Sequence, residues 1–294
     1  MPLLDVSSEV NRETLMEQTI INEIRRFAAE SPANRFPGSG DRYFDEPLVG
    51  FAAAGDPLFT DYKRIIGAFH LTPDELVAAA PEGEPWQPVT VVCWVLPVTK
   101  TTRESNRKEN RVPSPEWAQT RSYGEQFNTA LRKHVVAWLT GLGHRAVAPQ
   151  LSPAWKEYAD TPVGIASAWS ERHAAYAAGL GTFSLNDALI TPRGIAHRLG
   201  SVITGLALTP SGRPYPDHRH NCLWHREGTC GACVGRCPVG AITREGGHDK
   251  TRCRTYVYEE LPRAVGEIYG VPATGCGLCQ TRVPCEGVIP PGTR

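Results

Sequence analysis

The stretch "CLWHREGTCGACVGRCPVGAI", from Cys222 to Ile242, divides the chain into two unlike parts. It places four cysteines within sixteen residues and ends with Cys-Pro and a small apolar run. Eight of the nine cysteines lie between Cys222 and Cys285, and only Cys93 precedes them. Clustered thiols in a chain that shows no export signal predict metal binding rather than disulfides.

The spacing of these cysteines matches three of the four positions of an iron-sulfur motif. In C-x2-C-x2-C-x3-C-P, three cysteines bind one [4Fe-4S] cluster and the fourth binds a second cluster. Cys230, Cys233 and Cys237 fit the last three positions, but Glu227 stands at the first. Carboxylate is a harder and poorer ligand for cluster iron than thiolate. We therefore expect Cys222 to loop back and fill the vacancy, with Glu227 or an open iron as the alternatives.

Four further cysteines bring the count to eight, the number that two [4Fe-4S] clusters need. Crossed ligation gives one cluster bound by Cys222, Cys230, Cys233 and Cys285, and a second bound by Cys237, Cys253, Cys276 and Cys279. Zinc is the alternative, because paired C-x2-C units also form zinc sites. The third cysteine close to the first two and the Cys-Pro continuation favour iron-sulfur clusters. Two neighbouring clusters predict electron transfer.

The first 210 residues have the periodicity of an α/β domain. Helices are expected over residues 11–31, 59–81, 114–143 and 167–179, and strands over 88–99, 144–150, 187–192 and 198–210. The Gly/Pro-rich stretch 32–57 is expected to be irregular. The run "PVTVVCWVLPVT" (88–99) predicts a strand buried on both faces, with Cys93 as a small core residue. We divide the chain into domains 1–210 and 211–294, with 211–220 as a linker.

Charge and hydropathy narrow the choice of partners. The 294 residues carry 31 Lys and Arg against 31 Asp and Glu, so no global field attracts nucleic acid or anionic lipid. The first residues show no targeting signal, and no apolar run has the length of a membrane span. These features predict a cytoplasmic protein with no membrane partner, and they argue against a nucleic-acid partner.

Three segments together resemble one superfamily. "AGLGTFSLNDALITPRGIAHRLGSVIT" (Ala178 to Thr204) is similar to a block that epoxyqueuosine reductases and reductive dehalogenases share, and it is closer to the dehalogenase pattern. "TRSYGEQFNTALRK" (Thr120 to Lys133) is similar to the YxxGxDYHxxLRK segment of epoxyqueuosine reductases, and "DKTRCRTYVYEE" to their RCISYLTIE segment. Because the matches occur in the same order, we identify the chain as a divergent member of this superfamily.

The resemblance implies a nitroreductase-like α+β domain that holds cobalamin, supplied with electrons by a C-terminal ferredoxin-like domain with two [4Fe-4S] clusters. The cofactor contacts that it implies are Gly179, Gly181, Asn186 and Arg198. The two glycines would let the backbone approach the corrin ring, or they only end a helix and form a tight turn. Arg198 could bind an anion or the cofactor.

A proton donor is also needed for reductive chemistry. Tyr123, close to Arg121, is the candidate for this catalytic role, with packing on a helix face as the alternative. His173 and His197 flank the block of the superfamily and could ligate or hydrogen-bond a cofactor, or be ordinary helix and strand residues.

Two departures from the epoxyqueuosine reductase pattern bear on the substrate. Ile165 occupies the position of the acidic proton donor, which Asp160 could replace only if the loop were shifted, and Leu185 occupies a lysine position. We therefore expect an iron-sulfur reductase, with cobalamin as a possible cofactor, that acts on a small organic substrate. Its electrons would come from a low-potential donor such as ferredoxin or flavodoxin. The alternatives are a tRNA epoxyqueuosine reductase and a non-catalytic electron-transfer protein that docks on a partner enzyme.

Overall fold

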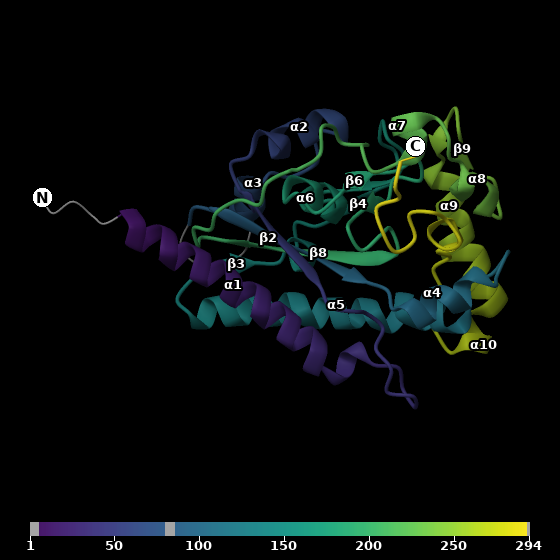
Figure 1. The fold of residues 1–294 in the computed structure, drawn as a ribbon, viewed down its shortest axis with the longest axis horizontal. Helices are drawn as coiled ribbons and strands as arrows, with labels where there is room; N and C mark the ends of the chain where they lie inside the picture. Colours follow the sequence, from purple (N-terminus) through teal and green to yellow (C-terminus); the bar gives the residue numbers. More distant parts are fainter. Residues whose placement is uncertain (1–5, 80–85, 293–294) are drawn as a thin grey trace, which may run out of the picture.

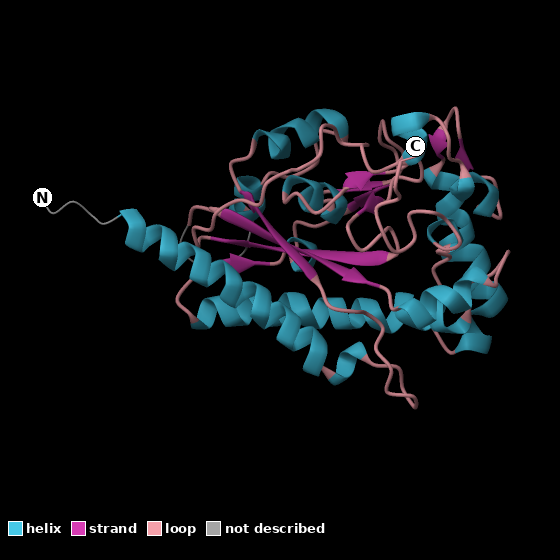
Figure 2. Cartoon of the chain, in the orientation of Figure 1, coloured by secondary structure: helices cyan, strands magenta, loops and turns pink. Residues whose placement is uncertain are grey.

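A four-stranded antiparallel sheet forms the centre of the computed structural model, which describes residues 6–79 and 86–292. Its strands lie in the order β1-β2-β8-β3 (Figure 2). Their bounds are Leu48–Ala53 (β1), Thr90–Pro97 (β2), His197–Thr204 (β8) and Ala146–Val147 (β3). Helices cover both faces of the sheet, so the expected mixed α/β domain is confirmed.

The central strand β2 is buried along its whole length. Its side chains alternate between the two faces, with Val92, Trp94 and Leu96 in one apolar cluster and Val91, Cys93 and Val95 in the other. This alternation follows from the two-residue period of a strand. The predicted two-sided strand and the core position of Cys93 are therefore confirmed.

Two long helices cover the first face of the sheet (Figure 1). These are α1 (Val6–Glu30) and α5 (Pro115–Gly141), both near their predicted positions. The Ser114 hydroxyl accepts a hydrogen bond from the backbone N–H of Trp117 and so caps α5. Phe127 and Leu131 of α5 are fully buried against Trp94 of β2.

Shorter helices cover the second face of the sheet. They are α2 (Pro57–Ile65), α3 (Pro73–Ala78) and α6 (Glu171–Ala177). Thr72 and Glu75 form a capping box at the start of α3. Two-residue strands form small hairpins beside α6: Glu157–Tyr158 (β4), Ala166–Ser167 (β5), Thr182–Phe183 (β6) and Leu189–Ile190 (β7).

Strand β1 corrects the expectation that residues 32–57 are irregular. Its free edge is covered by the linker, because Ser211 exchanges hydrogen bonds with Phe51: Ser211 N–H donates to the Phe51 carbonyl, and Phe51 N–H donates to the Ser211 hydroxyl. Because its edge is paired in this way, β1 does not need the apolar sequence pattern that is typical of a strand. Helix α4 (Lys100–Arg107), which the periodicity did not predict, follows β2 directly.

The cysteine-rich segment consists of short elements gathered at one end of the sheet, at the right in Figure 1. They are Leu223–Glu227 (α7), Ala232–Arg236 (α8), Ile242–Thr243 (β9), Gly247–His248 (β10), Lys250–Thr255 (α9), Glu267–Tyr269 (α10), and two π-helical turns, Tyr256–Glu260 and Pro262–Gly266. The ferredoxin-like character of this segment stays a prediction. Among the described helices, none has the length and apolar character needed to cross a membrane.

Candidate metal centre and adjoining cavity

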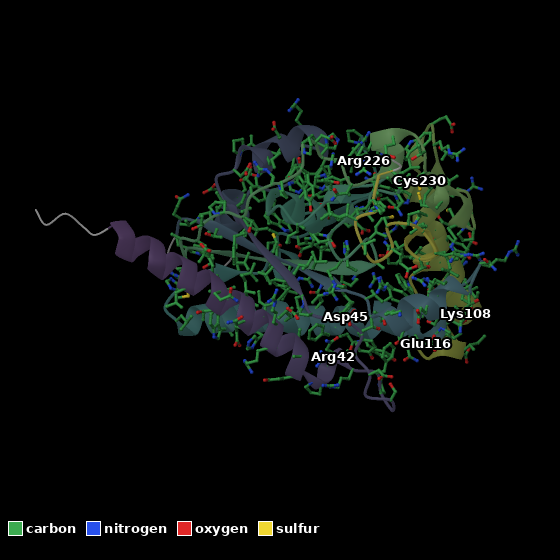
Figure 3. The ribbon with its side chains drawn as sticks, viewed as in Figure 1. Arg42, Asp45, Lys108, Glu116, Arg226 and Cys230 are labelled. Carbon is green, nitrogen blue, oxygen red and sulfur yellow. The ribbon has the colours of Figure 1, made fainter. Side chains whose placement is uncertain are left out.

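The structure brings Cys222, Cys230, Cys233 and Cys285 together around a small cavity of about 30 Å³. Apolar side chains such as Ile195 complete its wall. Burial and the nearby thiols of Cys222 and Cys230 raise the pKa of the Cys233 thiol to about 12. Cys230 is half-buried on the outer side of the segment (Figure 3). The carboxylate of Glu227, the alternative ligand, accepts a hydrogen bond from Arg226 Nε at 2.9 Å.

The other four cysteines, Cys237, Cys253, Cys276 and Cys279, line a second and larger cavity of about 390 Å³. Burial and the Cys253 and Cys237 thiols raise the pKa of Cys276 to about 12. The Cys233 thiol of the first set is among the neighbours that, with burial, raise the pKa of Cys279. The two sets of thiols therefore adjoin each other, with Cys233 and Cys279 at the junction.

The donor chemistry of both sets suits iron-sulfur clusters, which are held by four thiolates. All nine cysteines are free thiols. Within residues 6–79 and 86–292, no group of three His, Cys, Asp or Glu side chains is arranged to hold a single metal ion. Binding of a metal would displace the protons that burial retains on these thiols.

Arg236 fastens the cysteine-rich segment to the α/β domain. Its Nε donates to the carbonyls of Leu278 and Thr281, at 3.1 and 3.0 Å, and its Nη1 donates to the carbonyl of Glu109 at 2.7 Å. Its Nη2 donates to the carbonyl of Asn106 at 3.3 Å. One guanidinium thus ties α8, which lies between two cysteines, to the end of α4.

Glycines on either side of Cys276 let its loop lie directly on α5. Gly275 and Gly277 have φ angles of +61° and +65°. A Cβ at Gly275 would lie 2.8 Å from the side chain of Arg121, and a Cβ at Gly277 would overlap the indole of Trp117. Both conformation and space therefore require glycine here, and the loop fixes Cys276 at the cavity wall.

The wall of the large cavity opposite the cysteines comes from α5, α6 and β8. Arg198 of β8 lies in it and forms an ion pair with Glu125 of α5, whose carboxylate also accepts a hydrogen bond from Arg132 at 3.0 Å. Burial would raise the pKa of Glu125, but Arg198 and Arg132 lower it to about 2. The charge of Arg198 is therefore already balanced by Glu125.

Glu171 is the one carboxylate on the described wall of this cavity. Its Oε2 accepts a hydrogen bond from the Ser201 hydroxyl at 2.6 Å, and its Oε1 lies 3.4 Å from Arg132 Nη2. Burial raises the pKa of Glu171 above its ordinary value, although Arg132 and Ser201 oppose the shift. A carboxyl group with a raised pKa keeps its proton to a higher pH than an exposed carboxyl group does.

Three buried polar atoms of the lining residues have no hydrogen-bond partner in the described structure: Thr120 Oγ1, His197 Nδ1 and His248 Nδ1, the last of which lies 3.5 Å from Asp187 Oδ2. Thr120 is only 3% exposed. The other nitrogen of His197 bonds the carbonyl of Leu189 at 2.7 Å, and burial lowers the pKa of His197 to about 4. The imidazole is therefore neutral, with Nδ1 as an acceptor. Buried polar groups without partners are rare, and they indicate contact with a ligand or water.

Comparison with known proteins gives three curated sequence relatives and several solved structures of similar fold. No protein family model matches the chain. An epoxyqueuosine reductase of Gloeobacter violaceus is 30% identical over 203 residues, which are 66% of this chain and 56% of the relative. The chain therefore spans little more than half the length of that relative.

Two solved structures share the fold over 93% of this chain. An epoxyqueuosine reductase in complex with an epoxyqueuosine-modified tRNA-Tyr stem loop superposes with a TM-score of 0.51 at 18% identity, covering 66% of that chain. A catabolic reductive dehalogenase superposes with a TM-score of 0.52 at 14% identity, covering 36% of that chain. The chain is thus similar in sequence to epoxyqueuosine reductases and in fold to both kinds of reductase. The resemblance found in the sequence is therefore confirmed.

The structure places the site residues implied by the superfamily in different surroundings. Asn186 lies between the two cavities, where its Nδ2 donates to the carbonyl of Cys279 at 3.1 Å and its Oδ1 accepts from Ser184 and Ala188. Arg198 lines the large cavity. Asn186 thus holds a cysteine loop in place.

Gly179 and Gly181 are not among the residues that line the cavity. Gly179 follows the end of α6 with a φ angle of +72°, and a Cβ there would overlap the carbonyl of Gly212 in the linker. Gly181 packs in the same way against the carbonyl of Ile190. The structure thus gives both glycines a packing reason: one ends a helix, and both allow two chain segments to touch.

Tyr123 and His173 also lie outside the cavity wall. The Tyr123 hydroxyl donates to the carbonyl of Gly270 at 2.6 Å, so this residue joins α5 to the cysteine-rich segment. His173 packs in an aromatic group with Tyr62 and Phe183. Ile165 is likewise not among the lining residues.

Sequence reasoning missed Thr120 and Glu171 as wall residues. Thr120 belongs to a segment that the resemblance had singled out and Glu171 does not, but a hydroxyl or carboxylate within a helix carries no sign of the cavity it faces. The available signals were the position of Thr120 next to Arg121 and that of Glu171 shortly before the glycine-rich block.

Proposed function

We propose that the chain is an iron-sulfur reductase in which two [4Fe-4S] clusters deliver electrons to the large cavity. One observation carries this proposal: the eight clustered cysteines fall into two adjoining sets of four, and the second set lines the cavity. A first cluster held by Cys222, Cys230, Cys233 and Cys285 would accept electrons from a donor such as ferredoxin or flavodoxin. A second cluster held by Cys237, Cys253, Cys276 and Cys279 would release them beside the cavity.

Cobalamin is the proposed cofactor of the cavity, on the basis of the similarity to this superfamily. The fit rests on two features of the wall, namely the uncommitted Thr120 hydroxyl and the His197 Nδ1 acceptor, which can bond the amide groups around a corrin ring. When bound, cobalamin supplies a reducible cobalt centre for reductive chemistry. The residues of this chain would then bind it, orient it and limit the access of water.

Glu171 is the proposed proton reservoir for the reaction. It is the acidic group on the described wall, and burial raises its pKa. Tyr123, the candidate from sequence, gives its hydroxyl hydrogen to the Gly270 carbonyl instead. Glu171 could therefore hold the proton at Oε1 or Oε2 in a protein whose sequence has Ile165 at the acidic position of the relatives.

A small organic molecule is the first candidate substrate, because Ile165 occupies the acidic position of the epoxyqueuosine reductases and the formal net charge of the chain is zero. Transfer RNA is the second candidate substrate. It is favoured by the solved structure of similar fold that holds a tRNA stem loop, which keeps a nucleic-acid partner open despite the balanced charge of the chain. An electron-transfer protein without its own reaction is the remaining alternative.

Metal analysis of anaerobically purified protein tests the cluster assignment. About eight iron and eight sulfide per chain are expected for two clusters. Cys276→Ala should reduce both to about four, whereas the matched control Cys93→Ala, which changes the buried core cysteine, should leave them unchanged. Stoichiometric zinc, or equal loss of iron in both variants, would contradict the assignment.

Titration with cob(II)alamin tests the cofactor. Binding with a shift to the base-off spectrum at micromolar protein supports a cobalamin-dependent reductase. Absence of binding in protein that holds both clusters would leave the electron-transfer alternative and reject the reductase. Epoxyqueuosine-containing and unmodified tRNA stem loops, added to cobalamin-loaded protein, then distinguish a tRNA substrate from a small molecule.

A further inference from the structure

The large cavity has an excess of arginine on the wall formed by α5, α6 and β8. Arg121, Arg172 and Arg198 line it, and Glu171 is the lining carboxylate. Arg172 donates from Nη1 to the carbonyl of Asp187 at 2.7 Å. Arg198 is paired with Glu125, and Glu125 and Glu171 both also face Arg132. The carboxylates of this wall are therefore already engaged.

Arg121 forms no ion pair with a carboxylate in the part of the chain that the structure describes. The hydrogen bond found for it in the described chain joins its Nη2 to the neutral hydroxyl of Tyr258 at 3.2 Å. The charge of Arg198 and burial lower the pKa of Arg121 below its ordinary value. Two guanidinium groups that repel each other beside a cavity favour an anion, because a shared oxyanion removes the repulsion.

A second observation at the same place points to a ligand. Thr120, the neighbour of Arg121, is 3% exposed, lines the cavity, and has a hydroxyl without a hydrogen-bond partner in the described structure. The aliphatic part of Arg121 is held by Gly275 of the Cys276 loop, so the guanidinium is carried on a packed stem. A fixed cation next to an unused hydroxyl forms a built site rather than a chance surface charge.

We propose that Arg121 and Thr120 form an oxyanion subsite in the large cavity, which recognises a carboxylate or phosphate group on the molecule bound there. This inference rests on the proposed function, since it describes the ligand of the same cavity. A carboxylate would belong to a small organic acid as substrate, whereas a phosphate would belong to a phosphate-bearing substrate or cofactor. Guanidinium bonds either oxyanion through two parallel N–H groups.

Anaerobic calorimetry on the cluster-loaded protein tests the subsite without any turnover. The probes are benzoate, its uncharged analogue benzamide, and inorganic phosphate. We expect either benzoate to bind at least tenfold more tightly than benzamide, or phosphate to bind measurably. Arg121→Gln should weaken the binding of that oxyanion by about 10- to 100-fold, which is the usual effect of losing a charge-assisted hydrogen bond. It should leave benzamide binding unchanged.

Control variants separate the effect of the Arg121 charge from a general effect of substitution on the structure. Arg121→Lys should retain part of the oxyanion binding, and Arg64→Gln, which changes an exposed arginine of α2, should retain all of it. Binding of benzoate assigns the subsite to a carboxylate, and binding of phosphate alone assigns it to a phosphate group.

Three results would overturn the inference. The first is equal binding of benzoate and benzamide together with no binding of phosphate. The second is oxyanion binding that survives in Arg121→Gln, and the third is a changed cluster reduction potential in Arg121→Gln with unchanged oxyanion binding. Iron content and the cob(II)alamin spectrum, measured on the same samples, report separately on the proposed function. Protein with eight iron and bound cobalamin but no oxyanion selectivity rejects only the subsite. Protein that binds oxyanions but lacks iron rejects only the reductase.

Discussion

The sheet region and the cysteine-rich segment of this chain are held together by different forces. Each face of the sheet carries a cluster of nineteen buried residues, whereas the cluster around the cysteines contains six. Buried apolar area stabilises a fold in proportion to its size. The sheet region can therefore fold by burial alone. The cysteine-rich segment, with short helices and two-residue strands, has contacts such as those of Arg236, and under the proposed function metal ligation would also hold it together.

Removal of the metal is expected to have the largest effect and to separate the two regions. Metal ligation to thiolates contributes directly to folding in small sites. After anaerobic chelation, residues 221–286 should lose most of their protection from hydrogen exchange, while β2 and α5 keep theirs. Hydrogen exchange with mass spectrometry gives this measurement. Equal loss of protection in both regions would contradict the difference between them.

A substitution that creates a cavity in the core of the sheet region is expected to have the opposite effect: it should destabilise the sheet region and leave the cysteine-rich segment loaded with iron. Leu131 of α5 is fully buried, so Leu131→Ala should lower the free energy of unfolding by about 2–5 kcal/mol. The folded fraction should still contain the wild-type amount of iron per chain, because Leu131 lies in the apolar cluster of the sheet and not around the cysteines. Denaturant unfolding and iron analysis of the soluble protein check both parts. Loss of iron from folded Leu131→Ala would show that the regions are coupled more tightly than their cores suggest.

Loss of the Arg236 contacts should weaken the join between the regions. Arg236→Ala removes the donors for four backbone carbonyls, and each unsatisfied buried acceptor costs about 1–3 kcal/mol where water cannot replace the donor. We expect a total loss of about 2–4 kcal/mol in the free energy of unfolding, and faster hydrogen exchange at the end of α4. Arg263→Ala, which changes an exposed arginine of the same segment, should change stability by less than about 0.5 kcal/mol. Similar values for both variants would rule out the fastening role of Arg236.

The sequence predicted the parts of the structure that depend on local pattern. The two-sided burial of β2 could be read from a continuous β-branched run, and the thiol sets from the spacing of the cysteines. Strand β1 was missed because its edge is completed by Ser211, which lies about 160 residues away in the chain. Local patterns carry no information about such distant partners.

In the candidate site, too, the sequence could not show the contacts that single residues make with distant parts of the chain. Arg198 was predicted from the resemblance to bind an anion or cofactor, but the sequence could not show that Glu125 already neutralises it. In the same way, the glycines 179 and 181 were expected near a corrin ring, whereas each is required where two backbone segments touch. Charge balance and close approach arise from tertiary contacts, which the order of residues does not display.

Mild acid should produce the smallest effect, and it should act on the sheet region. His70 and His197 are held neutral in the fold, because burial lowers the pKa of each to about 4. In the unfolded chain their pKa is about 6.5, so the unfolded state binds more protons between these values, and stability is lost as the pH falls below about 6.5. Each histidine should cost about 1 kcal/mol between pH 7.5 and 5.5. His70→Gln should reduce the pH dependence of the free energy of unfolding by that amount, and His218→Gln, which changes an exposed histidine, should not alter it. An unchanged pH dependence in His70→Gln would mean that His70 titrates alike in the folded and unfolded protein and that its burial does not control its charge.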